Sequence, residues 1–213
     1  MKNSAKVKIC GIKRREDLLN AKTLGADYFG FILYEKSPRF ISFEVLKPLL
    51  NDISLDRVVF VDVMPSKEKI LQMQDFGCQN FQIHTHEKAS FSDYESYSKL
   101  IKKESLWLAP QLKDLNNFNE SLLEFADNFL IDTYSKEQIG GTGKVGDWSA
   151  FKELSSKHPN KRWILAGGLN PENIKDAGIL SEAEVLDVNS GIEEAPGIKN
   201  KEALKRLFDN IHS

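Results

Sequence analysis

The chain has 213 residues, of which 41% are hydrophobic and 28% are charged, and its formal net charge is -2. This length can bury a core, and the interspersed charges give neither a nucleic-acid footprint nor a basic membrane-facing surface. Only two cysteines are present, Cys10 and Cys78, which argues against a disulfide framework. No apolar run approaches the roughly 20 residues that span a bilayer, and the amino terminus has no apolar signal region. We therefore expect a cytoplasmic protein with a single domain over residues 1–213.

Short apolar runs alternate with amphipathic segments along the whole chain. The runs are mostly continuous, which is typical of parallel strands covered by helices. In chain order, the predicted strands span 7–10, 27–33, 57–63, 80–85, 106–112, 128–133, 162–168 and 184–190. Helical spacing is found at 15–25, from Ser42 onward, and at 67–77, 93–104, 117–126, 147–158, 170–180 and 200–212.

This alternation predicts βαβ units and a parallel sheet. Eight strand–helix units in 213 residues suit an α/β fold of the (β/α)8 TIM-barrel type, which can have about 200 residues. A doubly wound open sheet is the structural alternative, because it uses the same units.

The carboxyl ends of the predicted strands are where a barrel places its active site. The turns after the seventh and eighth strands read AGGLNPENI and NSGIEEAPG, and the loop after the sixth adds Gly140, Gly141 and Gly143. Glycines let backbone N–H groups approach an anion, so these loops predict a phosphorylated small-molecule ligand. The alternative is that the glycines only close tight turns.

Two ionisable residues, Cys10 and Asp132, lie at the carboxyl ends of the first and sixth predicted strands. A thiolate can accept a proton and a protonated carboxyl group can donate one, so the pair could share an isomerisation. A single cysteine is more often a small buried apolar residue, and that alternative applies to Cys10 until its position is known.

The segment GGTGK at 140–144 resembles the end of a nucleotide-binding P-loop. That motif requires a glycine where this chain has Gln138, and a hydroxyl residue where it has Val145. The mismatches argue against a P-loop, and Lys144 is interpreted as a loop charge.

Motifs spread over essentially the whole chain resemble one known family. They are KICGI (8–12), GFILYEKSPR (30–39), QIH (82–84), IDT (131–133), GGTG (140–143), DW (147–148), LAGGLNPEN (165–173) and DVNSG (187–191), followed by Pro196 and Gly197. Together they are similar to the phosphoribosylanthranilate isomerases of tryptophan biosynthesis.

The resemblance implies an Amadori rearrangement of N-(5-phosphoribosyl)anthranilate to 1-(2-carboxyphenylamino)-1-deoxyribulose 5-phosphate, without a metal or organic cofactor. It implies that Asp132 is the general acid, that Cys10 is the general base and that Arg39 holds the anthranilate carboxylate. We expect His84 to line the pocket. The residues implied for the 5′-phosphate are Gly143, Gly167, Gly168, Ser190 and Gly191. The only partner expected is the phosphorylated substrate, with no nucleic acid or membrane, and the protein is expected to be a monomer or a homodimer.

The fourth strand departs from the family pattern, because Thr85 and His86 replace a glycine and an acid. Any ligand role for this loop is therefore open. His84 and His86 lie on one side of an extended strand, but with Glu87 they make a thin ligand set for a metal. Asp62, at the end of the third strand, is left as either an orienting group or a solvated turn residue, and Cys78 is interpreted as structural.

Three other functions compete with this interpretation. An indole-3-glycerol-phosphate synthase would need a lysine near the reacting carbon, and no lysine ends any predicted strand. A pentose-phosphate epimerase would favour paired acids or a metal. A non-catalytic sensor barrel would bind a phosphorylated metabolite without turnover.

Overall fold

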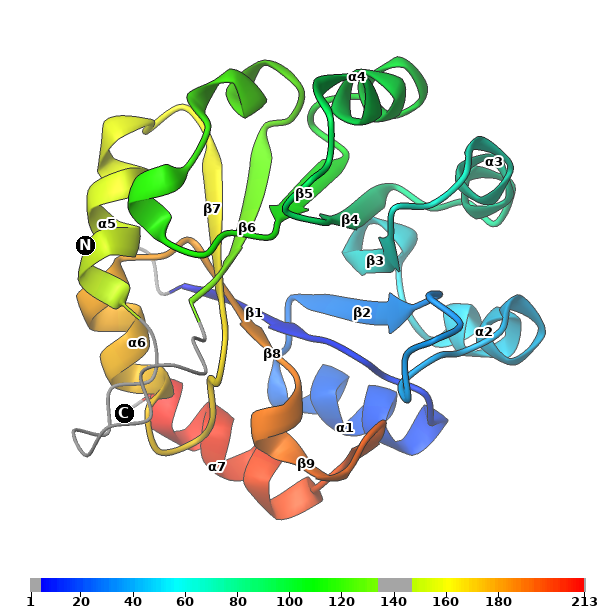
Figure 1. Ribbon diagram of the computed structural model, residues 1–213. Helices are drawn as coiled ribbons and strands as arrows, with labels where there is room; N and C mark the ends of the chain where they lie inside the picture. Colours follow the sequence, from blue (N-terminus) through cyan, green and yellow to red (C-terminus); the bar gives the residue numbers. More distant parts are fainter. Residues whose placement is uncertain (1–4, 134–146, 213) are drawn as a thin grey trace.

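A computed structural model of the protein describes residues 5–133 and 147–212. Its parallel strands form a closed barrel in the order β1 to β8, with helices around the outside (Figure 1). The strands are β1 (Lys6–Ile9), β2 (Tyr28–Ile32), β3 (Val58–Val63), β4 (Asn80–Thr85), β5 (Leu106–Pro110), β6 (Asn128–Asp132), β7 (Arg162–Ala166) and β8 (Val185–Val188). Each overlaps a predicted strand. The (β/α)8 barrel is confirmed, and the open-sheet alternative is wrong because β1 pairs with β8.

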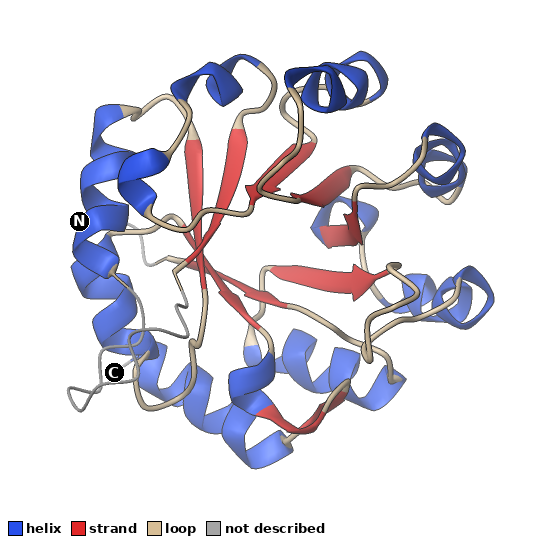
Figure 2. Ribbon diagram, in the orientation of Figure 1, coloured by secondary structure: helices blue, strands red, loops and turns tan. Residues whose placement is uncertain are grey.

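Helices occupy the outer layer, as the ring around the strands in Figure 2 shows. They are α1 (Arg15–Leu24), α2 (Phe43–Leu49), α3 (Lys67–Asp75), α4 (Phe91–Leu100), α5 (Trp148–Lys157), α6 (Ile174–Ser181) and α7 (Lys201–His212). Local signals set several ends: Ser66 caps α3 through the Lys69 N–H, and Gly25 ends α1 at φ +100°. Within the described ranges, no helix has both the length and the apolarity needed to cross a membrane.

One predicted helix, at 117–126, is wrong. The chain there forms two short 3-10 helices, η3 (Leu115–Asn117) and η4 (Glu120–Glu124). The Asp114 side chain accepts a hydrogen bond from the Asn116 N–H, and the Asn119 side chain accepts one from the Ser121 N–H. Such side-chain bonds to nearby backbone compete with helix formation, so the apolar spacing alone was misleading.

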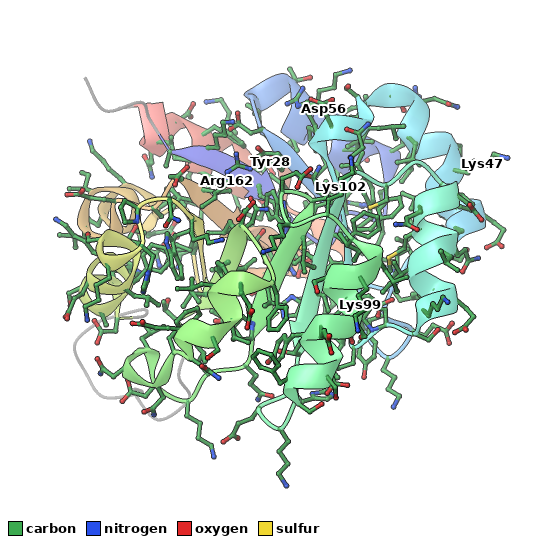
Figure 3. The ribbon with its side chains drawn as sticks, turned by 90° about the horizontal axis from the view of Figure 1, so that it is seen from above. Tyr28, Lys47, Asp56, Lys99, Lys102 and Arg162 are labelled. Atoms are coloured by element: carbon green, nitrogen blue, oxygen red, sulfur yellow. The ribbon has the colours of Figure 1, made fainter. Side chains whose placement is uncertain are left out.

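Side chains alternate between the inside of the barrel and the layer beneath the helices. The outward-facing residues of the strands pack with the helices in the larger apolar cluster, whereas a smaller cluster fills the interior. Trp107 is fully buried in the interior, and its ring meets that of Tyr28 edge-on at 5.0 Å. Tyr28 and Arg162 begin their strands, and Figure 3 shows both on one side of the molecule. The interior is therefore packed at the amino ends of the strands, which leaves the carboxyl ends for a site.

A small hairpin follows β8 and was not predicted. After η6 (Ser190–Ile192), strands β9 (Glu193–Ala195) and β10 (Ile198–Lys199) pair antiparallel, with Gly197 at φ +81° between them. The backbone of Lys199 is held to α1: its N–H donates to Asp17 at 3.3 Å and its carbonyl accepts from Arg14 at 3.2 Å. This anchoring holds the side chains of Glu193 and Lys199 close to the end of β1.

Candidate active site

A cavity of about 200 Å³ opens among the carboxyl ends of the strands. Six of the residues predicted for the site line it: Cys10, His84, Asp132, Gly167, Gly168 and Ser190. Gly143, together with Gly140, Gly141 and Lys144, lies outside the described residues. The barrel therefore brings together, in one cavity, side chains that are far apart in the sequence.

Cys10 directly follows β1, and the residue is buried, with 3% of its surface exposed. Gly30 on β2 makes the space for it, because a Cβ atom at that position would lie 2.8 Å from the Cys10 Sγ and 3.1 Å from the Lys8 Nζ. Burial raises the pKa of the Cys10 thiol, and the neighbouring Lys8 ammonium opposes this effect. Cys10 is thus buried, as a structural cysteine would be, and it also lines the cavity, as a proton acceptor must.

Lys8 forms an ion pair inside the barrel with Asp187 on β8. The Lys8 Nζ donates to the Asp187 Oδ1 at 2.8 Å, and Lys8 has no exposed surface. The two residues face each other across the pairing of β1 with β8. Burial alone would lower the pKa of Lys8, but Asp187 and Cys10 outweigh burial and raise it. The ammonium therefore stays charged.

Asp132 ends β6 and is exposed at the cavity. The next residue, Thr133, fixes the strand end, because its N–H and its Oγ1 both donate to the Ala166 carbonyl at 3.0 Å. The Asp132 carboxyl group consequently lies at the accessible side of the cavity, whereas the Cys10 thiol lies at its buried side. This arrangement suits an acid and a base that act on different atoms of one ligand.

His84 lies on β4, two residues after Gln82, with which it shares a hydrogen bond of 2.8 Å between Gln82 Nε2 and His84 Nε2. Burial, together with the Lys8 charge, lowers the pKa of His84 to about 4, so the imidazole is neutral at neutral pH. Thr85 faces away from the cavity and bonds to the Tyr94 hydroxyl at 3.0 Å. His86 follows the strand and is exposed. The two histidines therefore do not form a pair.

Arg39 lies in the loop after β2 and is not among the residues that line the cavity; its guanidinium meets Glu193. The Arg39 Nη2 donates to the Glu193 Oε2 at 2.7 Å, and its Nε donates to both carboxylate oxygens at 3.0 Å. Lys199 donates to the same carboxylate at 2.9 Å. Burial alone would raise the pKa of Glu193, but Arg39 and Lys199 outweigh burial and lower it. The residue predicted to bind a substrate carboxylate is thus already oriented by a carboxylate of the protein.

The glycine turns after β7 and β8 are packed against each other. Gly167 and Gly168 have φ values of +102° and +64°, which other residues rarely adopt. A Cβ atom at Gly191 would lie 2.0 Å from the Leu169 carbonyl oxygen, so only glycine fits there. The side-chain amide of Asn173 donates to the Gly168 carbonyl at 3.0 Å. The two turns form one rigid side of the cavity.

Asp62 and Cys78 face away from the cavity. Asp62 is buried in the layer beneath the helices, where its carboxylate accepts from the Val63 N–H at 2.7 Å, and burial raises its pKa. Burial raises the pKa of Cys78 to about 12, which agrees with a structural role for this thiol. Within the described ranges, no three or more His, Cys, Asp or Glu residues are grouped to hold a metal ion.

Sequence reasoning missed Lys8, Asp187, Glu193 and Lys199. A signal was present for Lys8, since it precedes Cys10 by two residues and must share its face of the strand. Lys8 was not predicted, because it lies inside β1 and not at the strand end where a catalytic lysine is expected. Glu193 and Lys199 belong to the hairpin, whose short strands have no distinct apolar pattern.

Comparisons with known proteins show the family of this chain. A family model described as N-(5′phosphoribosyl)anthranilate (PRA) isomerase matches residues 7–210. The N-(5′-phosphoribosyl)anthranilate isomerase of Zymomonas mobilis subsp. mobilis is 33% identical over 215 residues, covering 98% of each chain. Phosphoribosyl anthranilate isomerase from Thermus thermophilus has a similar solved structure, with a TM-score of 0.79, 30% identity, and coverage of 97% of this chain and 98% of that one.

A second solved structure adds a ligand. It is a phosphoribosyl anthranilate isomerase in complex with reduced 1-(o-carboxyphenylamino)-1-deoxyribulose 5-phosphate, with a TM-score of 0.74, 28% identity and coverage of 98% of each chain. The ligand of that protein carries both a carboxyphenyl group and a phosphate.

Proposed function

Because the chain belongs to the N-(5′-phosphoribosyl)anthranilate isomerase family, we propose that Cys10 and Asp132 carry out the proton transfers of that isomerisation. The protein is an isomerase of tryptophan biosynthesis. The net reaction moves one hydrogen from C2′ to C1′ and one from the 2′-oxygen to the ring oxygen of the same sugar. The required groups are therefore a proton donor at the ring oxygen and a proton acceptor at C2′.

In the first step, the carboxyl group of Asp132 donates its proton to the furanose ring oxygen. The bond between C1′ and that oxygen breaks as the anthranilate nitrogen lone pair forms a C=N bond, which gives an open-chain Schiff base. The exposed position of Asp132 at the cavity supports this role, because a group there can exchange its proton with solvent between turnovers.

In the second step, the Cys10 thiolate removes the proton from C2′. The electron pair of that C–H bond forms a C1′=C2′ double bond, and the C=N electrons return to nitrogen. The resulting enolamine tautomerises to the ketone when C1′ gains a proton and the 2′-hydroxyl loses one. The buried side of the cavity, where Cys10 lies, excludes water from this step and favours an oriented encounter between thiolate and C2′.

The remaining contacts orient the substrate. We infer that Arg39 holds the anthranilate carboxylate, since a planar guanidinium already fixed by Glu193 suits a second carboxylate. His84, as a neutral imidazole, faces the same cavity. The glycine turns with Gly167, Gly168, Ser190 and Gly191 are proposed to bind the 5′-phosphate through backbone N–H groups, together with the loop that contains Gly143.

The observation that carries this proposal is the meeting of Cys10 and Asp132 in one cavity, from strands on different sides of the barrel. The test follows the loss of phosphoribosylanthranilate fluorescence on adding purified protein. We expect turnover by the wild type, and rates lower by about 10²-fold or more for Cys10→Ala and for Asp132→Asn.

Two variants serve as matched controls for these substitutions. Cys78→Ala removes the other thiol, and Asp62→Asn neutralises another strand-end acid, but both residues face away from the cavity. Both controls should retain most of the activity. A wild type that binds substrate without turnover would support a sensor, and a near-normal rate in either test variant would remove that residue from the mechanism.

A further inference from the structure

The buried ammonium of Lys8 lies next to the cavity, on the side of the amino ends of the strands. Lys8 precedes Cys10 by two residues on β1, so both side chains point into the barrel. Cys10 and Asp187 line the cavity, whereas the Lys8 side chain is fully buried beneath them, toward the amino ends of the strands. A ligand in the cavity therefore meets the thiol and the carboxylate, and the ammonium acts on it only through these two groups.

The two strands next to β1 set the position of the ammonium, β8 through a hydrogen bond and β2 through the space at a glycine. Asp187 accepts its hydrogen bond at 2.8 Å across the pairing of β1 with β8. On the β2 side, the position of a Cβ atom at Gly30 lies within 3.1 Å of the Lys8 Nζ and within 2.8 Å of the Cys10 Sγ. The absence of a side chain at Gly30 lets the cation and the sulfur share this space.

We propose that Lys8 is a positioning residue for the base: its buried ammonium stabilises the thiolate form of Cys10 that the reaction requires, and Asp187 holds the ammonium in place. The inference rests on the proposed role of Cys10. In this arrangement the Cys10 sulfur accepts the proton and meets the substrate. The Lys8 ammonium lies behind it, inside the barrel, and supplies the opposite charge.

A buried thiolate needs such a partner. Burial favours the neutral thiol and raises the pKa of Cys10, and the Asp187 charge acts in the same direction. Lys8 provides the strongest opposing charge, and Lys199 from the hairpin adds a weaker one. Among the described residues, the other ionisable groups that line the cavity are the neutral His84 and the acid Asp132, and the pair of Arg39 and Glu193 lies next to Lys199.

The same contacts argue against Lys8 as the proton acceptor itself. Although burial lowers the pKa of an ammonium group, the charges of Asp187 and Cys10 more than compensate and raise the pKa of Lys8. A lysine that stays protonated cannot accept a proton from C2′. Its contribution is a fixed positive charge, which acts through the sulfur.

The test measures ionisation of the Cys10 thiol directly. In a Cys78→Ala background, Cys10 is the only cysteine of the chain, so thiolate absorbance and the rate of iodoacetamide alkylation against pH both report on it. Lys8→Met keeps an unbranched side chain that is one atom shorter and removes the charge. We expect it to raise the thiol pKa by about 1–3 units, the range expected for loss of an adjacent opposite charge. The acidic limb of the pH profile of kcat/KM should shift to higher pH together with the thiol pKa.

A second variant predicts a shift of opposite sign. Asp187→Asn removes the negative charge that disfavours the thiolate and should lower the thiol pKa. If the ion pair only stabilised the fold, the two variants would not shift the pKa of the Cys10 thiol in opposite directions. If Lys8→Met fails to fold, Lys8→Gln takes its place, because its side-chain amide can donate to Asp187 but carries no charge. An unchanged thiol pKa in a folded Lys8→Gln variant overturns the proposal.

Lys161→Met is the matched control for loss of a buried lysine. The Lys161 ammonium is also largely buried and pairs with Asp127 at 2.7 Å, but at the amino end of β7. It should leave the thiol pKa unchanged. A folded Lys8→Met variant with an unchanged thiol pKa would refute the proposal. Opposite shifts combined with full turnover by Cys10→Ala would instead refute the proposed mechanism and leave the ion pair established.

Discussion

Arg39 binds a carboxylate of its own protein before any substrate arrives. Glu193 accepts from its Nε and Nη2, and the Arg39 side chain keeps 21% exposure while Glu193 is nearly buried. The pairing fixes the plane of the guanidinium, which lowers the entropy lost when a second carboxylate binds. It also sets a geometric requirement, because an incoming carboxylate has to use the donors that Glu193 leaves accessible.

Replacing Arg39 by lysine tests this requirement. Arg39→Lys keeps the positive charge next to Glu193 but loses the planar fork, so we expect KM to rise about tenfold, the equivalent of one weakened charged hydrogen bond, with a small change in kcat. Steady-state kinetics check this. Arg15→Lys is the matched control, because Arg15 makes a similar two-point contact with Asp52 at the surface. An unchanged KM in Arg39→Lys would argue against carboxylate recognition by this residue.

Residues at strand ends could be predicted from the sequence because their position depends on one periodicity. Once a run is recognised as a barrel strand, the residues near its carboxyl end lie at the catalytic edge, and Cys10, His84 and Asp132 were found in this way. Lys8 lies deeper and was missed. Its role depends on Asp187, which follows it by 179 residues, and no local pattern joins the two.

At the scale of elements, the turns after β7 and β8 depend on each other. Gly191 packs against the backbone of the preceding unit, and a Cβ atom there would contact the Leu169 carbonyl oxygen and the Asn170 Cβ. Because the clash is with main chain rather than with the end of a mobile side chain, the turns cannot both keep their positions if Gly191 gains a side chain.

Gly191→Ala should therefore destabilise the protein by about 1–3 kcal/mol, the usual cost of overpacking. Urea unfolding measures the change. The control is Gly178→Ala within α6, where a Cβ atom would meet the Leu186 Cδ1 at an ordinary 3.5 Å. Helix propensity predicts that this substitution stabilises by about 0.5–1 kcal/mol. Equal effects of the two substitutions would contradict the tight packing between the turns.

Elements with a long apolar run were predicted, and elements made by side-chain bonds to backbone were not. The barrel strands bury both faces, so their composition identified them even where the exact ends differed. Where 117–126 suggested a helix, Asp114 and Asn119 instead stabilise local turns. The β9–β10 hairpin has strands of three and two residues, too short for an apolar pattern, and depends on Gly197 and on anchoring to α1.

At the scale of the whole molecule, the number of strand–helix units predicted a closed barrel, whereas the residues that pair where the sheet closes could not be predicted. An open sheet and a barrel contain the same units, and they differ in whether the first strand pairs with the last. Here the paired residues run from Lys6 with Val185 to Ile9 with Val188. This long-range pairing brings Lys8 to Asp187 and completes the cavity.

That pairing has a consequence for the order in which the molecule assembles. Synthesis delivers Lys8 early, but its counter-ion arrives only with the final strand, and a buried ammonium without a partner costs several kcal/mol. The barrel interior around Lys8 should therefore stay open to water until β8 pairs with β1. We expect a fragment ending at residue 182 to lack cooperative thermal unfolding, and a separate chain of residues 183–213 to restore it on mixing. Cooperative melting of the fragment alone would contradict this order, whereas recovery on mixing would make closure of the barrel the step that completes both the fold and its catalytic base.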